Sequence, residues 1–402
     1  MRTAGIIAEY NPFHNGHAWQ AAELKKRGFG AVVCVCSPGV VQRGTAALFP
    51  ARVRTRAALA GGADLVLSLP APYATLSAEG FAAAGVALLS ALGCVDALCF
   101  GTEARRLEDV TQTAALLESP AFTPALRAQL DAGLPLPAAR AAAAEALRPG
   151  AGAVLRRPND ILGVEYCKAL LRQHSALTPL ALARQGAAHD APLDTAPGRY
   201  ASASALRALV RAKGAAALAP HVPPACLPLY VQAEAEGDVL DEHAFGIAVL
   251  SRLRAMDAAN FCAVRGAAEG LENRLAAAVQ SAGTLDALVQ AMQTKRYATA
   301  RLRRLALDAA LGYDGGLPAL PPYLHVLGAN ETGLAVLRRA RQTALLPLSH
   351  SLADLAAQSA PAACVAAAHA AAEDLTALCL RRPAPKGTAY TAKPVFPAGE
   401  KK

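Results

Sequence analysis

One strand-to-helix turn near the N-terminus constrains the fold of this chain most strongly. Residues 4–8 form an apolar run that is typical of a buried strand, and Pro12 ends it because proline has no N–H to donate to a ladder. Helical periodicity runs from Ala18 to Gly28, and glycine is a favourable C-terminal cap. His14 and His17 therefore lie between a buried strand and a helix.

The residues of this turn are suited to bind an anion. The first N–H groups of a helix have no partner within the helix, and the helix dipole is positive at that end. Gly16 leaves out a side chain between the two histidines, so a phosphate can approach the backbone closely. The two imidazoles can donate hydrogen bonds to phosphate oxygens whose charge rises as a bond breaks. We expect His14 and His17 to be catalytic residues for chemistry at phosphorus.

Composition limits the class of protein. A chain of 402 residues is too long for one ordinary core, and 53% hydrophobic residues with 18% charged residues indicate a globular, helix-rich protein. The net charge of +9 permits an acidic partner such as nucleic acid. The nine cysteines lack zinc-binding spacing, and we find no signal peptide and no apolar span of 18 residues. We therefore expect a soluble, cytoplasmic protein without membrane association.

Strands and helices alternate through the first part of the chain. This alternation predicts an α/β fold with a doubly wound parallel sheet and the strand order 3-2-1-4-5. That order would place Gly101 beside the turn that carries the histidines. The absence of GxGxxG after the first strand, and of GxxxxGK[ST], disfavours a hydride-transfer fold and a P-loop kinase. The predicted strands after the first are 31–36, 63–70, 96–100 and 177–184, and the predicted helices between them include 53–60 and 77–92.

Two further segments contribute to the predicted nucleotide domain. Residues 107–147 are rich in alanine and predict a helical lid or insertion. Asn159 or Asp160 is a plausible N-cap for a helix that ends at Gln173. A later helix begins near Ser202 and Ser204 and carries Arg207 one turn in, which predicts a second anion site, although either serine could be only a cap.

The second half of the chain predicts an α-helical C-terminal domain. We place the nucleotide domain at 1–214, a proline-rich linker at 215–228, the helical domain at 229–382 and a disordered tail at 383–402. The predicted helices of the C-terminal domain span 242–257, 270–281, 285–311, 331–340 and 351–381.

A basic stretch lies within the third of these helices. Five basic residues in ten, with Tyr297 among them, suit a nucleic-acid backbone; the alternative is a solvated basic face with the tyrosine in the core. On a helix, three of the arginines would share one broad face. The basic residues are Lys295, Arg296, Arg301, Arg303 and Arg304, of which 296, 303 and 304 share that face.

The motifs together resemble those of a known family. His14, Gly16 and His17 match the HxGH signature of the nucleotidyltransferase superfamily. The ordered set of longer motifs looks like the tRNA(Met) cytidine acetate ligase family as far as about residue 340. These motifs are EYNPFHNGH (9–17), VQRG (41–44), GADLVLSLP (62–70), SAE (77–79), LCFGTE (98–103), PNDILGVEY (158–166), SASALR (202–207), EGLENR (269–274), KRYATARLRR (295–304) and LHVLGAN (324–330).

The resemblance implies a two-step activity. The family adenylates acetate with ATP and then transfers the acetyl group to N4 of the wobble cytidine of elongator tRNA(Met), which forms N4-acetylcytidine. Mg²⁺ is expected on the phosphates, although no carboxylate cluster is dedicated to it and no protein ligand for a metal is assigned. No obligate protein partner is evident. We expect His14, His17 and Arg207 to be catalytic.

The expected set of ATP-binding residues has two parts: the contacts that the family resemblance implies, and the two serines of the second anion site. It comprises Ile7, Ala8, Glu9, Tyr10, Asn11, Pro12, Phe13, His14, Asn15, Gly16, His17, Gln20, Gly101, Asn159, Arg184, Gln185, Ser202 and Ser204.

Some positions depart from the family pattern, and two other functions stay open. Residues 37–41 read SPGVV where SGNFV is usual, Gln20 stands where histidine is frequent, and Ala51 and Arg52 replace lysine and tryptophan. These changes leave two questions open: how efficiently the chain catalyses the family's reaction, and which acyl substrate it uses. The alternatives are a cofactor-forming adenylyltransferase that acts on a phosphorylated small molecule, and a non-catalytic RNA-binding protein built on the same fold.

Overall fold

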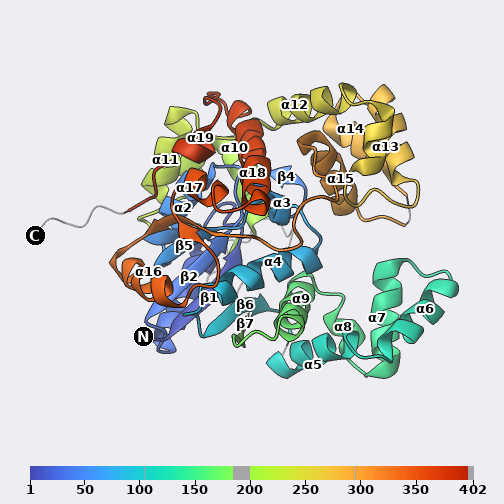
Figure 1. The fold of residues 1–402 in the computed structure, drawn as a ribbon, viewed down its shortest axis with the longest axis horizontal. Helices are drawn as coiled ribbons and strands as arrows, with labels where there is room; N and C mark the ends of the chain where they lie inside the picture. The colour runs from blue at the N-terminus through green and yellow to red at the C-terminus, as the bar shows by residue number, and fades with distance from the viewer. Residues whose placement is uncertain (105, 184–199, 295, 397–402) are drawn as a thin grey trace, which may run out of the picture.

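A seven-stranded sheet lies at the centre of the computed structural model, which describes residues 1–104, 106–183, 200–294 and 296–396 (Figure 1). Its strand order is β7-β6-β1-β2-β5-β8-β9, and the first five strands are parallel. The predicted order 3-2-1-4-5 and the doubly wound α/β fold are thus confirmed. The strands are β1 Thr3–Ala8, β2 Ala31–Cys36, β5 Leu65–Ser68, β6 Ala97–Thr102, β7 Thr178–Ala183, β8 Leu324–Ala329 and β9 Leu348–Ser349.

Helices cover both faces of this sheet. Successive side chains of a strand point to opposite faces, so Val33 and Val35 of β2 join one core while Val32 and Cys34 join the other. A two-stranded hairpin follows β2. The elements that surround the parallel strands are α1 Asn15–Lys26, α2 Ala51–Ala60, α3 Ala71–Ala74, α4 Ala78–Ala91, α9 Pro158–Arg172, α10 Ala203–Lys213, and the hairpin strands β3 Val40–Val41 and β4 Thr45–Ala46.

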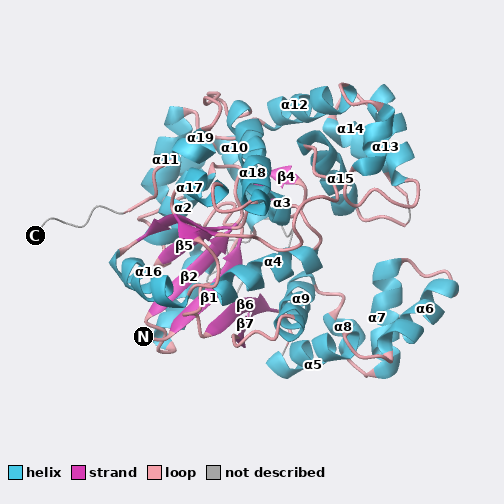
Figure 2. Cartoon of the chain, in the orientation of Figure 1, coloured by secondary structure: helices cyan, strands magenta, loops and turns pink. Residues whose placement is uncertain are grey.

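Two groups of helices extend on the same side of the molecule. The alanine-rich insertion forms α5 Leu107–Leu117, α6 Phe122–Asp131, α7 Leu136–Leu147 and α8 Ala151–Val154. A second group, α12 Glu242–Arg254, α13 Leu271–Ser281, α14 Leu285–Met292 and α15 Thr299–Leu311, encloses a third hydrophobic core. Figure 2 shows that both groups are helical, whereas all the long strands lie in the central sheet. Within the described residues, no helix is both long enough and apolar enough to cross a bilayer.

The remaining helices pack around the sheet instead of forming a separate domain. They are η1 Ala215–Leu218, α11 Leu227–Glu236, α16 Glu331–Thr343, α17 Leu352–Ala356, α18 Ala360–Leu378 and α19 Thr388–Thr391. The short η2 Ala258–Ala263 instead belongs to the group of α12–α15, because it contacts α13. Helices α16 and α18 come from the C-terminal part of the sequence, yet they contact β5 and α3 of the N-terminal part.

The structure corrects three predicted boundaries. The predicted linker 215–228 is part of the core on one face of the sheet, where Leu218, Val222 and Cys226 are buried. The region 229–382 is not purely helical, because β8 and β9 extend the sheet. The predicted helix 285–311 is two helices separated at residues 293–298, so Arg296 lies in a connection and not on the shared face that we predicted.

The prediction of a disordered tail is wrong for residues 383–396. Val395 donates its N–H to the carbonyl of Leu327, and the N–H of Ala329 donates to the carbonyl of Val395. Residues 397–402 lie outside the described part of the chain. The sheet edge at β8 is therefore covered by the end of the same chain, as expected for an edge with unpaired backbone groups.

A buried arginine joins the loops at the C-terminal ends of the first strands. Arg54 on α2 is fully buried. Its Nε donates to the carbonyl of Phe49 at 2.9 Å, and its Nη1 donates to the carbonyls of Glu9 at 2.6 Å and Ser37 at 2.8 Å. Its Nη2 donates to the carbonyl of Pro38. These bonds fix the chain immediately after β1 and β2.

We predict that Arg54→Met destabilises the fold by about 4 kcal/mol, because buried carbonyl groups lose their donor. The exposed Arg52→Met on the same helix is the matched control and should change the free energy of unfolding by less than about 0.5 kcal/mol. Urea unfolding followed by circular dichroism measures both. Equal unfolding free energies for the two variants would contradict the assignment.

Candidate active site

A cleft of about 480 Å³ opens where β1 and β6 end side by side. Most of the predicted ATP-binding residues line it. These are Ile7, Ala8, Glu9, Tyr10, Asn11, His14, Gly16, His17, Gln20, Gly101, Asn159, Ser202 and Ser204, together with the predicted catalytic residue Arg207. The prediction that Gly101 lies beside the histidine turn is thus confirmed.

Some predicted contacts lie elsewhere. Pro12 and Phe13 do not line the cleft, and Phe13 is a core residue that packs against Tyr10 with ring centroids 4.9 Å apart. The side chain of Asn15 instead donates to the carbonyl of Pro220 at 3.2 Å. Arg184 and Gln185 lie outside the described residues. A contiguous motif therefore contributes only some of its members to the cleft, because the turn must also be packed against the protein.

The two histidines form the N-terminal cap of α1. His14 is the N-cap residue, and its Nδ1 accepts a hydrogen bond from the N–H of Gly16 at 3.1 Å. The Nδ1 of His17 accepts from the N–H of His14 at 3.2 Å, and the two rings stack with centroids 3.8 Å apart. Since each Nδ1 is an acceptor, each neutral ring carries its proton on Nε2. The helix begins at Asn15, three residues earlier than predicted.

Gly16 is required by the position of the His14 ring. A Cβ atom added to Gly16 would lie 2.9 Å from Cε1 of His14 and 3.3 Å from Cδ2 of Tyr200. We predicted that this glycine leaves room for a phosphate, but the ring of His14 is its nearest neighbour. The glycine therefore lets the imidazole fold back over the helix N-terminus.

A second helix N-terminus lies in the same cleft. Ser202 is the N-cap of α10, and its Oγ accepts from the N–H of Ala205 at 3.2 Å, so it caps the helix as well as lining the cleft. Arg207 donates from Nη1 to the carbonyl of Asn11 at 2.9 Å. Burial lowers the pKa of Arg207, and the carboxylate of Glu9 opposes that change. The guanidinium remains charged because the arginine side chain stays protonated in proteins.

The other wall of the cleft is apolar and aromatic. Phe100 of β6, Phe81 of α4, and Leu162 and Tyr166 of α9 line it, and the rings of Phe100 and Tyr166 are 5.8 Å apart. Asn159, in the first turn of α9, also lines the cleft. The cleft thus joins an apolar wall to cationic and N–H donors, which is the combination that a nucleotide requires.

Neither predicted N-cap of α9 is correct. The N-cap is Arg157, with Pro158 in the first turn, and Asn159 donates from its side chain to Glu103. Asp160 is fully buried and accepts from the Thr102 hydroxyl at 2.7 Å and from the N–H of Glu103 at 2.6 Å. Asp160 thus fixes the end of β6 against α9.

Comparison with known proteins agrees with this geometry. The family model described as HIGH Nucleotidyl Transferase matches residues 1–386. A protein named tRNA(Met) cytidine acetate ligase from Acetivibrio thermocellus is 34% identical over 88% of this chain and 89% of that protein. Proteins of the same name from Caldanaerobacter subterraneus and Latilactobacillus sakei are 34% and 35% identical over 87% of this chain and 88% and 87% of their own length. This chain belongs to the tRNA(Met) cytidine acetate ligase family.

Two solved structures have the same fold over almost the whole chain. The crystal structure of Thermotoga maritima TmcAL bound with alpha-thio ATP has a TM-score of 0.89 and 26% sequence identity, and covers 98% of this chain and 99% of its own. The apo form of the same protein has a TM-score of 0.90 with the same identity and coverage.

Several residues of the cleft were not in the predicted set. Trp19, Gln42, Arg43 and Tyr200 line it. Gln42 and Arg43 stand in VQRG, one of the motifs shared with the tRNA(Met) cytidine acetate ligase family, so that motif was the available signal. Trp19 and Tyr200 had no such signal because their approach, with ring centroids 6.5 Å apart, depends on the packing of α1 against the residues before α10.

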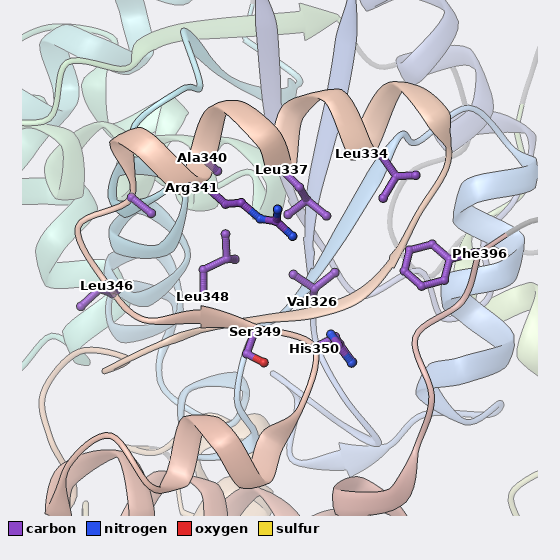
Figure 3. Close-up of a pocket in the computed structure, with 11 residues that line it drawn as sticks. Val326, Leu334, Leu337, Ala340, Arg341, Leu346, Leu348, Ser349, His350 and Phe396 are labelled. Carbon is purple, nitrogen blue, oxygen red and sulfur yellow. The ribbon is translucent and has the colours of Figure 1, made fainter.

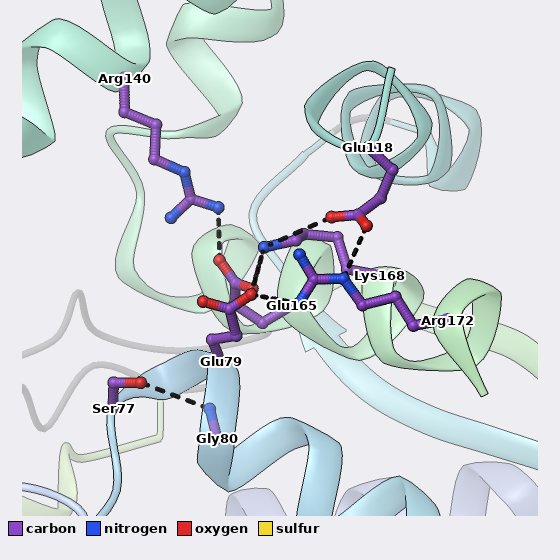
Figure 4. Close-up of polar contacts among 8 residues, drawn as sticks. All are labelled: Ser77, Glu79, Gly80, Glu118, Arg140, Glu165, Lys168 and Arg172. Atoms are coloured by element: carbon purple, nitrogen blue, oxygen red, sulfur yellow. Dashed lines mark hydrogen bonds and ion pairs between the residues drawn. The ribbon is translucent and has the colours of Figure 1, made fainter. Parts of the chain in front are cut away.

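A network of charged residues braces the walls of the cleft from behind (Figure 4). Lys168 of α9 is buried, and its Nζ lies 2.9 Å from the Glu165 carboxylate and 3.1 Å from that of Glu79 in the first turn of α4. Arg140 of α7 pairs with Glu165, and Arg172 bonds Glu118 at 2.6 Å. The network therefore ties the insertion to α4 and α9.

A second cavity of about 480 Å³ lies at the opposite edge of the sheet, between α16 and β8–β9 (Figure 3). Its lining is mainly aliphatic; the Arg341 side chain points from α16 toward the middle of the lining residues, His350 follows β9, and Phe396 lies at one end. Unlike the first cavity, it is lined by a single histidine, and no two helix N-termini meet among its described lining residues. We therefore assign the chemistry to the cleft at β1 and β6.

Proposed function

We propose that this protein activates acetate with ATP as acetyl-adenylate and transfers the acetyl group to N4 of the wobble cytidine of elongator tRNA(Met), which forms N4-acetylcytidine. The observation that carries the proposal is the meeting of two helix N-termini, two histidines and Arg207 in one cleft with an aromatic wall. The names of the relatives and the ATP analogue bound in the Thermotoga maritima crystal structure support the same assignment.

In the first step, ATP lies across the ends of β1 and β6, with adenine near Gly101 and Asn159 and the phosphates over α1. An acetate oxygen attacks the α-phosphorus, and the bond from that phosphorus to the bridging oxygen breaks, so pyrophosphate leaves. The Nε2–H groups of His14 and His17, with Arg207, donate to the oxygens that gain charge.

In the second step, the exocyclic amine of the cytidine attacks the acetyl carbon of the adenylate, AMP leaves with the electron pair of the anhydride bond, and the amine releases one proton to water. The base has to leave its stack to reach this carbon. The protein forms no covalent bond with the substrates, so it needs no activated nucleophile of its own.

The cleft fits a Mg²⁺ ion that arrives with the phosphates. Such an ion usually keeps several waters and takes one or two protein carboxylates, and Glu9 supplies the carboxylate among the described lining residues. One oxygen of Glu9 already accepts the N–H of Gln42 at 2.8 Å. When bound, the ion would neutralise charge on the phosphates.

An exchange assay tests the proposed activation step. Labelled pyrophosphate should enter ATP only when acetate is present, and it should do so without tRNA, because the first step needs no RNA. Exchange that depends on a phosphorylated small molecule, with acetate inert, would assign the protein to the cofactor-forming adenylyltransferases. If no acid supports exchange, the remaining alternative is a non-catalytic RNA-binding protein on the same fold.

We predict that His17→Ala lowers the rate of acetate-dependent exchange by about 10²- to 10³-fold, since one donor to the developing charge is lost. It should also lower stability by about 1 kcal/mol, because the imidazole accepts the N–H of His14 within the cap. His243→Ala, at an exposed position of α12, is the control. Thermal melting measures stability. Loss of folding with undiminished activity per folded molecule would show that His17 is structural.

Among the described basic residues before and within α15, three are available to a partner at the surface, and one is directed into the protein. Arg296 is exposed; Arg301 stacks over Tyr297, with its Cζ atom 4.7 Å from the ring centroid; Arg303 reaches Asp286 at 3.1 Å. Lys295 lies outside the described residues, and Arg304 is directed toward the nucleotide domain. We propose that Arg296, Arg301 and Arg303 contact the tRNA backbone.

We predict that the double variant Arg296→Glu, Arg303→Glu weakens tRNA binding and lowers the slope of log affinity against log salt by about 1.5 to 2 units. Acetate-dependent exchange should continue. Arg338→Glu with Arg341→Glu on α16, at the far edge of the sheet, makes the same change in charge and should have a smaller effect. Filter binding over a salt series measures this, and identical slopes for the two double variants would refute the interface.

A further inference from the structure

At Gly44 the β3–β4 hairpin lies directly against the backbone of helix α15. Gly44 lies in the turn of this hairpin and has φ of +73°, a conformation that favours glycine. A Cβ atom on Gly44 would lie 2.5 Å from the backbone nitrogen of Arg304 and 2.6 Å from the carbonyl carbon of Arg303. At this point no side chain separates the backbone of the hairpin from that of the helix, so a displacement of one moves the other.

Arg304 differs from the basic residues around it. Its Nη1 donates to the carbonyl of Gln42 at 3.3 Å, and burial lowers its pKa while Asp308 opposes that change. Arg303, the preceding residue, instead pairs with Asp286 at the surface. A basic residue that is half-buried against a carbonyl of the hairpin has little surface to offer to a nucleic acid.

Gln42 connects this contact to the cleft. Its N–H donates to the Glu9 carboxylate at 2.8 Å, and its side-chain amide donates to the carbonyl of Leu76 at 3.2 Å. Gln42, Glu9 and the next residue, Arg43, all line the ATP cleft. The carbonyl that Arg304 binds therefore belongs to a residue that lies in the cleft wall.

A second contact fixes α15 at a neighbouring point. Asp308, one turn after Arg304, accepts from the Thr75 hydroxyl at 2.8 Å and from Arg265 at 2.8 and 2.9 Å. Thr75 directly precedes Leu76, to which the Gln42 side chain donates. The segment continues into α4, whose Ala78 and Phe81 line the cleft. Helix α15 thus holds two separate segments of the cleft wall.

We propose that Arg304 is a positioning residue for the ATP cleft and not a tRNA contact: by holding the Gln42 carbonyl against α15, it sets the place of Glu9, Gln42 and Arg43 around the reacting phosphates. The inference rests on the proposed acetate activation. It gives helix α15, which also carries the proposed tRNA contacts Arg301 and Arg303, a part in positioning the groups for that step.

The test is acetate-dependent ATP–pyrophosphate exchange by the full chain without tRNA. We expect Arg304→Ala to lower kcat by about 10- to 100-fold, since a small misplacement of charged groups is costly, and to change KM for ATP by less than about threefold because the aromatic wall is untouched. Arg304→Lys keeps a donor and should recover much of the loss. Arg252→Ala is the matched control, because Arg252 donates to the carbonyl of Ala310 at the same 3.3 Å but lies away from the hairpin.

The affinity for tRNA separates this role from the alternatives. Arg304→Ala should bind tRNA within about twofold of the wild-type protein. Normal exchange with weakened tRNA binding would overturn the proposal, and so would equal loss of exchange in Arg252→Ala. If Arg304→Ala does not fold, Arg304→Gln, which keeps part of the side-chain stem, is judged by the same criteria. Absence of exchange in the wild-type protein would overturn the proposed function itself.

Discussion

The structure around the active site depends on the burial of the Arg54 guanidinium among backbone carbonyls. A buried cation is tolerated only where its N–H groups are satisfied, and here the acceptors come from the loops after β1 and β2. Glu373 of α18 accepts the N–H of Gly39 from the other side of the same loop. The segment 37–41, where the sequence analysis found a departure from the expected family pattern, is therefore fixed from two directions. It leads directly into Gln42 and Arg43, which line the cleft.

The parallel sheet was predictable because its signals are local. Each apolar run ends at a proline, a glycine or a polar residue, and right-handed crossovers leave few strand orders. The position of β8 was not predictable in this way. Its six residues enter the sheet antiparallel to β5 because Asn330 donates to Asp64 at 3.0 Å, and because Gly333 lets α16 contact the carbonyl of Asp64. These contacts join residues more than 260 positions apart, as the pairing of Asn330 with Asp64 shows.

The candidate site was predictable to the extent that its residues belong to motifs at the ends of strands. The histidine turn, Gly101, Asn159 and Ser202 meet as expected, because the C-terminal ends of neighbouring parallel strands share one edge. The basic stretch was misjudged, because a run of arginines does not reveal which side chains pack. Arg304 is held by the hairpin, and Arg296 precedes the helix. A helical-face argument fails where the helix begins later than the pattern suggests.

The pairing of β5 with β8 bears on how the polypeptide reaches its final state during synthesis. The parallel strands leave the ribosome first, and the edge of β5 then presents unpaired N–H and C=O groups until residues 324–329 follow. The same holds for β8, whose far edge is completed by β9 and Val395. A nascent chain that ends after the nucleotide domain, residues 1–214, would keep these unpaired backbone groups exposed along β5. Complete translation is thus a condition for pairing the edge of β5, and truncated products are the species most exposed to aggregation.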